Sequence, residues 1–268
     1  MKVLASLIIG LLAALIASVQ LFGTIFRKDE SKIDYENRIV NDAQKFIPIL
    51  DGKSLTNWDG DTTYWRVENG TLTGEVTESN LLNHNSFIIW QGGEPADFEL
   101  KGEYKITENG NSGINYRSER LPDIPFVLKG YQADIDGQNR YTGQNYEERK
   151  RTTLAYIFQK TIVNDCGDLD GNSNISSKVI NNAWSCVTVK KSLGDPDSLG
   201  KNIKSNDWNS FRLVIKGNHF LHYINGILIS DVTDNDVVNR TQKGLIGMQV
   251  HVGPAMKVQF RNLLLKEL

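Results

Sequence analysis

The sequence predicts an all-β protein, a sandwich of two antiparallel sheets over residues 46–268. Short apolar runs alternate with polar residues from Phe46 onward, and Gly, Asn and Asp punctuate these runs often. No long segment repeats its apolar residues with a helical period, so helices are expected to be few and short. A chain of 268 residues suits one large sandwich with one core.

The first segment predicts export. Lys2 precedes an uncharged, mostly apolar run over residues 3–26, and charged residues follow at 27–30. Residues 1–30 are therefore expected to form either a cleaved signal peptide or a transmembrane anchor helix. The anchor is slightly favoured, because the small residues lie early in the run and the run is long enough to span a bilayer. Residues 31–45 would then be a linker, and the sandwich would lie in the periplasm or outside the cell.

Within the sandwich, the clearest predicted strand spans residues 97–106, where apolar and charged side chains alternate. Two later strands, 211–215 and 220–224, are separated by Gly217-Asn218. Asn225-Gly226 then lies between apolar runs, which is a strong signal for a hairpin turn.

Two further segments complete the predicted sheet elements. Residues 257–265 are rich in apolar side chains and predict a C-terminal strand. Residues 159–207 are irregular apart from a strand-like stretch at 184–189, which predicts an elaborated loop region bordering the ligand site.

The charge composition limits the kinds of molecule that the protein is expected to bind. The chain has 30 Lys plus Arg against 32 Asp plus Glu, a formal charge of -2, so no basic field would attract nucleic acid. A neutral or polar ligand fits this balance better. The chain has two cysteines, Cys166 and Cys186, which in an oxidising compartment either form a disulfide or remain separate thiols.

Polar side chains recur at every second position of three strand-like segments: Asn115 and Arg117; Gln132, Asp134 and Asp136; Gln249 and His251. Side chains two positions apart on a strand share a face. If the segments lie on one sheet, these groups converge on a groove suited to sugar binding and acid–base chemistry. Structural explanations remain open: Arg117 as an ion-pair partner of Asp134, His251 as a core histidine, and Asn115 as a turn cap.

Other residues are candidates for sugar contacts. Tyr146 and Glu147 lie in a charged stretch that forms either the rim of the groove or a surface turn. On its predicted strand, His222 is placed to reach the groove. The run from Gln132 to Asp136 compares with the Glu-x-Asp-x-Glu strand of retaining β-glucanases of sandwich fold, but a carboxamide at Gln132 cannot be the glycosyl nucleophile. Ordinary glucanase hydrolysis is therefore disfavoured.

Residues 46–268 as a whole resemble the 3-keto-disaccharide hydrolase domain family. Ordered motifs carry the resemblance: Leu50 to Leu55 with Trp58, Trp65 to Gly74, Asn111 to Arg117, Gly130 to Asp136, Asp207-Trp208-Asn209, Asn225-Gly226, Ser230 to Asp234, Ile246 to Pro254 and Val258 to Asn262. The resemblance implies a concanavalin A-like jelly-roll sandwich. It also implies activity on glycosides whose C3 hydroxyl has been oxidised to a ketone, and an upstream sugar 3-oxidoreductase that supplies them.

The resemblance further implies roles for the polar residues. A C3 ketone acidifies the C2 proton, so a base can remove it, the enolate can expel the C1 substituent, and water can then add. His251 or Asp134 would be the base, and Arg117 or a bound divalent cation would stabilise the enolate. The oligosaccharide or glycoside would be bound by Asn115, Gln132, Asp136, Tyr146, Glu147, His222 and Gln249. A cation, if one binds, would be held by Asp134, Asp136 and His251. The alternative function is a non-catalytic carbohydrate-binding module.

Overall fold

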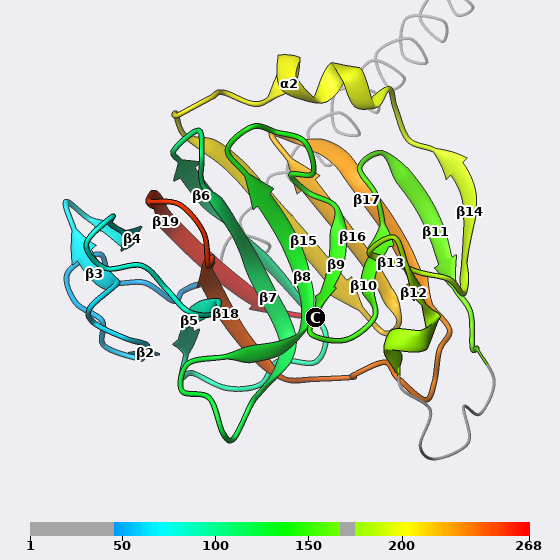
Figure 1. The fold of residues 1–268 in the computed structure, drawn as a ribbon, viewed down its shortest axis with the longest axis horizontal. Coiled ribbons are helices and arrows are strands. Elements are labelled where there is room, and N and C mark those ends of the chain that lie inside the picture. The colour runs from blue at the N-terminus through cyan, green and yellow to red at the C-terminus, as the bar shows by residue number, and fades with distance from the viewer. Residues whose placement is uncertain (1–45, 167–174) are drawn as a thin grey trace, which may run out of the picture. The chain divides into compact units, whose positions relative to one another are not determined.

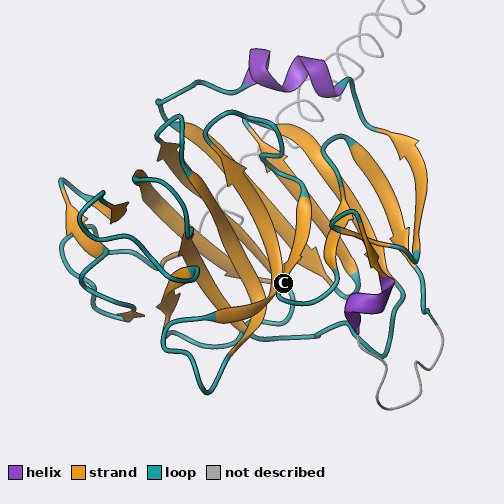
Figure 2. Cartoon of the chain, viewed as in Figure 1, coloured by secondary structure: helices purple, strands orange, loops and turns teal. Residues whose placement is uncertain are grey.

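The computed structural model describes residues 46–166 and 175–268. Residues 47–268 form one unit built from two stacked β-sheets (Figures 1 and 2), so the predicted all-β class is confirmed. In the described residues the helical elements are short: two 3-10 turns, Ile175–Lys178 and Pro196–Ser198, and helix α2, Leu199–Asn202. None of these is long and apolar enough to cross a bilayer. The predicted signal or anchor helix lies outside the described residues.

The first sheet, sheet A, has the strand order β14-β11-β17-β16-β15-β6-β19-β4-β3, with β1 added beside β19. Its strands are β1 (Ile47–Pro48), β3 (Trp65–Glu68), β4 (Thr71–Val76), β6 (Phe98–Ile106), β11 (Gln159–Val163), β14 (Val187–Ser192), β15 (Asn209–Lys216), β16 (His219–Ile224), β17 (Ile227–Asp234) and β19 (Met256–Glu267). The predicted strands 97–106, 211–215, 220–224 and 257–265 all lie in this sheet.

The second sheet, sheet B, has the order β12-β13-β10-β9-β8-β7-β18-β5-β2. Its strands are β2 (Trp58–Asp59), β5 (Ser86–Trp90), β7 (Asn111–Arg120), β8 (Leu128–Asp136), β9 (Asn145–Glu148), β10 (Thr152–Ala155), β12 (Val179–Ile180), β13 (Ala183–Trp184) and β18 (Leu245–Val250). This sheet carries the polar strands that the sequence singled out.

The sheets are mostly antiparallel, but each contains a parallel pair that the sequence prediction missed. β11 runs parallel to β17, and β10 runs parallel to β13. Parallel neighbours require a long crossover rather than a hairpin, and no local turn signal marks such a connection.

Alternation explains how the strands bury one face. On β15, Phe211, Leu213 and Ile215 are buried while Ser210 and Arg212 are exposed. The turn at Asn225-Gly226 connects β16 to β17, and both residues have positive φ, 48° and 79°, as a two-residue hairpin turn requires. The predicted hairpin is therefore confirmed.

The core lies between the two sheets and is rich in aromatic rings. Tyr116 and Tyr131 of sheet B stack at 5.5 Å between ring centroids, and Phe220 of sheet A packs 4.8 Å from Tyr131. Burial of each such side chain stabilises the fold by about 1.5–3 kcal/mol. This aromatic layer packs one face of sheet B against sheet A, and the other face of sheet B carries polar groups.

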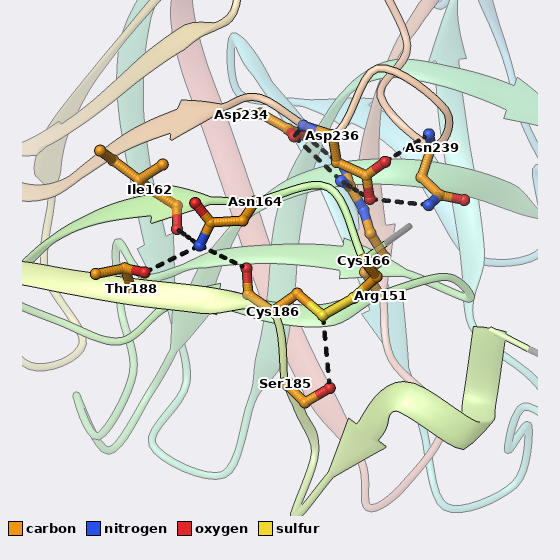
Figure 3. Close-up of a disulfide and its surroundings, with 10 residues drawn as sticks. All are labelled: Arg151, Ile162, Asn164, Cys166, Ser185, Cys186, Thr188, Asp234, Asp236 and Asn239. Carbon is orange, nitrogen blue, oxygen red and sulfur yellow. Dashed lines mark hydrogen bonds and ion pairs between the residues drawn. A yellow bond between two sulfur atoms is a disulfide. The ribbon is translucent and has the colours of Figure 1, made fainter. Parts of the chain in front are cut away.

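The irregular region 159–207 contains more strand than predicted, because β11 begins directly at Gln159 and pairs with β14. Cys166, after β11, and Cys186, before β14, form a disulfide with a Cα–Cα distance of 5.8 Å (Figure 3). Beside it, Asn164 donates from Nδ2 to the carbonyl oxygen of Cys186 at 3.3 Å and to Thr188 Oγ1 at 2.9 Å. The disulfide therefore closes the long connection between β11 and β14 at its base, next to the Val163–Val187 pair.

Candidate active site

The candidate site lies on the face of sheet B that points away from the core. On β8, Tyr131, Ala133 and Ile135 belong to the core, so Gln132 and Asp134 point to the opposite face. A cavity of about 550 Å³ opens there. Its lining is largely polar: Asn85, Asn111, Gln132, Asp134, Arg140, Tyr141, Gln144, Tyr146, Glu148, Thr153, Tyr156, Ile157, Asn181, Asn182 and His251. This volume and polarity suit a sugar ring.

Asp134 is a buried carboxylate of this lining, and two carboxamides hold it. Gln132 donates from Nε2 to Oδ1 at 2.7 Å, and Gln144 donates from Nε2 to Oδ2 at 2.6 Å. Burial raises the pKa of Asp134 to about 7, and the two amide hydrogen bonds oppose that rise. The group can therefore accept or release a proton near neutral pH.

Glu148 is a second carboxylate in the same cavity. Burial also raises its pKa, and the hydrogen bond that Asn85 Nδ2 donates to Oε1 at 3.1 Å opposes the rise. The charge of Glu148 contributes to the raised pKa of Asp134. Two carboxyl groups that resist ionisation thus share one cavity.

His251 presents an acceptor nitrogen to the cavity. Its Nδ1 lies 2.5 Å from the carbonyl oxygen of Val252. A carbonyl oxygen can only accept, so Nδ1 carries the proton and Nε2 of the neutral ring has a free lone pair. Burial lowers the pKa of His251, which favours this neutral form at pH 7.

Gln249 supports the site from β18 without lining the cavity. Its Nε2 donates to Oε1 of Gln132 at 3.2 Å, and Gln132 in turn donates to Asp134. The amide of Gln132 is therefore oriented from both ends. Gln132, Asp134 and Gln249 thus lie on the outer face of sheet B, and His251, directly after β18, lines the same cavity.

Arg117 does not join this group. Position 117 has φ of 45° within a register irregularity between Tyr116 and Glu119, which breaks the alternation of β7. The guanidinium is buried and donates to the carbonyl oxygens of Ala96 at 2.8 Å and Gly217 at 2.7 Å and to Asp97 at 3.0 Å. Its position is that of a structural clamp between the sheets, away from Asp134.

Glu147 and His222 also lie in the interior rather than at the cavity. Glu147 is fully buried and pairs with Arg151, Oε2 to Nε, at 2.5 Å. His222 Nε2 lies 3.0 Å from the hydroxyl of Tyr116, and burial lowers its pKa to about 4. Side chains alternate along β9, so Tyr146 and Glu148, which flank Glu147, line the cavity instead.

Two more predicted residues lie on the outer face of sheet B, but their side chains bind other protein groups. Asp136 is buried and accepts from Arg140 Nε and Nη2, each at 3.1 Å, and from the backbone N–H of Arg140 at 2.7 Å. Asn115 lies opposite Gln132 in the β7–β8 ladder, and its Nδ2 donates to Ser118 Oγ at 3.3 Å. Neither lines the cavity.

Sequence reasoning missed Gln144, Asn85 and Arg140, and it placed Glu148 in the charged stretch at the rim without choosing it as a site residue. Gln144 precedes β9 in the turn after Gly143, and Asn85 precedes β5, so neither falls within an alternating strand pattern. Glu148 was detectable, since it is two positions from Tyr146 on the same predicted segment. The signal for Gln144 exists only in space, where its amide reaches Asp134.

The proposed cation ligands do not form a metal site in the described structure. Asp136 is occupied by Arg140, and among residues 46–166 and 175–268 no three His, Cys, Asp or Glu side chains are grouped to hold a metal ion. The residues therefore do not fit the Asp134, Asp136 and His251 ligand set, and no reaction step is assigned to a metal.

Comparisons with known proteins bear on the fold and the family. A protein of unknown function with a galectin-like fold from Bacillus subtilis matches with a TM-score of 0.51 and 11% identity, over 83% of this chain and 94% of that one. A proposed glycosyl hydrolase from Parabacteroides distasonis matches with a TM-score of 0.50 and 18% identity, over 84% of this chain and 100% of that one. At these identities the likeness shows the fold alone.

No curated protein matches this chain. The model of the 3-keto-alpha-glucoside-1,2-lyase-like domain, the 3-keto-disaccharide hydrolase type, matches residues 45–266. This match spans the whole sandwich, including every strand that builds the cavity. The chain therefore belongs to the family of 3-keto-alpha-glucoside-1,2-lyase-like domains.

Proposed function

We propose that this domain cleaves 3-keto-glycosides by elimination followed by hydration. The observation that carries the proposal is Asp134, a buried carboxyl with a pKa of about 7 in a polar cavity large enough for a sugar ring. A general base is most effective when its pKa lies near the working pH. Family membership supports the same class of reaction.

In the proposed reaction Asp134 removes the C2 proton, and the C2–H electron pair forms the enolate of the C3 ketone. The ketone re-forms as the C1–O bond breaks, which leaves a C1=C2 double bond and an alcohol that takes up one proton. Water then adds its hydroxyl to C1 and a proton to C2, so the net change is hydrolysis. No protein nucleophile is required, which agrees with the carboxamide at Gln132.

Other cavity residues supply the remaining steps. Glu148, a second carboxyl group in the same cavity, is assigned as the proton donor to the leaving oxygen. The free Nε2 of His251 suits activation of the water that adds to C1. The fixed positive charge of Arg140, which lines the cavity, faces the developing enolate in place of Arg117.

The chemistry implies an earlier oxidation of the substrate, and the sequence and the disulfide bear on the compartment. Since the reaction starts from a ketone, an oxidoreductase that oxidises the C3 hydroxyl must act first. The apolar run at residues 3–26 and the disulfide between Cys166 and Cys186 support action outside the cytoplasm, and the length of the run supports anchoring in the membrane. Fractionation of producing cells tests this part, and recovery of the chain in the cytoplasm with reduced thiols would contradict it.

The reaction is tested with the full chain, methyl 3-keto-glucoside and unoxidised methyl glucoside. We expect turnover of the keto substrate alone, and we expect Asp134→Asn to lower kcat/KM by about 10²- to 10⁴-fold. Asp59→Asn is the matched control, since Asp59 is an exposed carboxylate that pairs with Arg120. In D₂O the product must carry deuterium at C2.

Two outcomes oppose the proposal. Hydrogen retained at C2 would show direct hydrolysis without elimination. Inertness of wild type and variant alike, with glucoside binding retained by both, would leave a carbohydrate-binding module.

A further inference from the structure

A second, smaller cavity adjoins the candidate active site. It has a volume of about 200 Å³ and shares Thr153 and Tyr156 with the polar cavity. It lies at the edge of the sandwich, where β10 and β13 of sheet B face β11 and β14 of sheet A. The two cavities are therefore direct neighbours, separated by the side chains that they share.

The second cavity differs from the first in chemistry. Its lining is mainly apolar: Leu154, Ala155, Ala183, Trp184, Val187 and Val189. Leu154 and Trp184 are buried core residues, so they form a fixed wall. Val189 and Tyr156 expose 54% and 46% of their surface, which an apolar ligand group would remove from water.

We propose that this cavity is the leaving-group subsite and that it takes a small apolar aglycone of one ring. The proposal rests on the proposed function, because it assigns the keto sugar to the polar cavity. A volume of about 200 Å³ suits one ring, since an apolar cavity of about 150 Å³ in another protein binds benzene. The preferred substrate class is thus the 3-keto-glycoside of an apolar alcohol.

A second sugar ring suits the cavity less well. The hydroxyl groups of a second sugar would need hydrogen-bond partners. In the lining, Thr153 and Gln159 have polar side chains, and Tyr156 and Trp184 each have one polar group on an aromatic ring. The side-chain oxygen of Gln159 already accepts from the backbone N–H of Tyr156 at 3.1 Å. Hydroxyl groups buried without partners cost free energy that an apolar ring avoids.

The test compares benzyl and methyl 3-keto-glucosides of the same anomeric configuration with the full chain. The released alcohols have nearly equal acidity, so the comparison measures binding rather than leaving-group chemistry. We expect kcat/KM for the benzyl substrate to exceed that for the methyl substrate by about tenfold, from burial of the ring. A 3-keto-disaccharide should not show this advantage.

Val189→Glu places a charge in the subsite at an exposed position, and Val238→Glu is the matched control at an exposed valine outside it. We expect Val189→Glu to remove the benzyl preference, and we expect Val238→Glu to change neither the benzyl preference nor methyl turnover. If the methyl 3-keto-glucoside is turned over without a preference for the benzyl substrate, or if the 3-keto-disaccharide is preferred, the apolar subsite is wrong and the proposed function still holds. If no keto substrate is turned over, the proposed function is wrong. Equilibrium binding of benzyl and methyl glucosides then tests the subsite by itself, and equal binding of the two would show that the cavity does not take an apolar aglycone.

Discussion

At the scale of single residues, the environment of Asp134 sets the chemistry of the site. The carboxyl lies on the outer face of β8, where it lines the cavity but exposes only 6% of its surface. Its two oxygens have amide donors, which stabilise the anion only in part against burial. Its pKa of about 7 therefore reflects a balance between burial and hydrogen bonding.

This balance has a consequence for stability. The pKa of folded Asp134, about 7, lies above its ordinary value of 3.8, so the folded protein retains a proton that the unfolded chain loses between these values. Stability from this group is present below pH 3.8 and is lost as the pH rises through 7. We expect Asp134→Asn to gain up to about 4 kcal/mol relative to wild type between pH 4 and pH 8.

Denaturant unfolding of both proteins at the two pH values measures this change. Asp59→Asn, which alters an exposed carboxylate, should follow the wild-type pH dependence. Equal pH dependence of wild type and Asp134→Asn would mean that Asp134 is not desolvated.

At the scale of elements, the close approach of β7 and β8 positions Gln132. Gly113 lies opposite Asp134 in the ladder, and a Cβ at position 113 would lie 2.4 Å from Cδ of Gln132. The flexible side chain of Gln132 occupies the space that glycine leaves. Glycine at this position thus allows the amide to reach the carboxylate.

Gly113→Ala is expected to displace Gln132 and so remove one hydrogen bond to Asp134. Because that bond lowers the pKa of Asp134, its loss raises the pKa further. The rising limb of the pH–kcat/KM profile should move to higher pH, and Gln132→Leu should move it in the same direction. An unchanged profile in both variants would rule out this positioning role.

A disulfide closes the long connection between the paired strands β11 and β14. Cys166 and Cys186 are 20 residues apart, and closure of such a loop stabilises a protein by about 3 kcal/mol. We expect the double variant Cys166→Ser, Cys186→Ser to lose stability of this order, as measured by denaturant unfolding. Reductant should destabilise the wild type and have no effect on the double variant. Equal stability of the two proteins under oxidising conditions would contradict this role.

At the scale of the whole sandwich, a buried ion cluster ties the two sheets together. Arg151 donates to Glu147 of β9, to Asp234 of β17 at 2.7 Å, and to Asp236 at 3.2 Å. Tyr131 adds a hydrogen bond from its hydroxyl to Asp234 at 2.6 Å. The cluster lies behind β9, which carries Tyr146 and Glu148 into the cavity.

Arg151→Met should strongly destabilise the fold, because it leaves the buried carboxylates without their cation. We expect a loss of about 3–5 kcal/mol in the free energy of unfolding. Arg66→Met is the control: Arg66 pairs with Glu68 and Glu75 on the surface, and exposed pairs contribute at most about 1 kcal/mol. Similar losses in the two variants would contradict a special role for the cluster.

The sequence alone determined the fold class, the main strands and the core of the candidate site. Alternation on β8 was enough to place Gln132 and Asp134 together, since a regular strand sends every second side chain to one face. The same rule failed where the backbone departs from regular geometry. Arg117 lies within a bulge, and Glu147 was chosen on a segment where its neighbour Glu148 faces the cavity.

Only the tertiary structure decided which polar groups meet. Gln144 reaches Asp134 from a turn, and Asn85 reaches Glu148 across 63 positions of sequence. The pKa of Asp134 depends on burial by segments distant in the sequence, and the apolar subsite exists because β13 and β14 pack beside β10 and β11. A periodic pattern reports which face a side chain takes, because that is local geometry. Contacts between turns and strands, and the desolvation they cause, arise only when segments distant in the sequence fold over the outer face of sheet B.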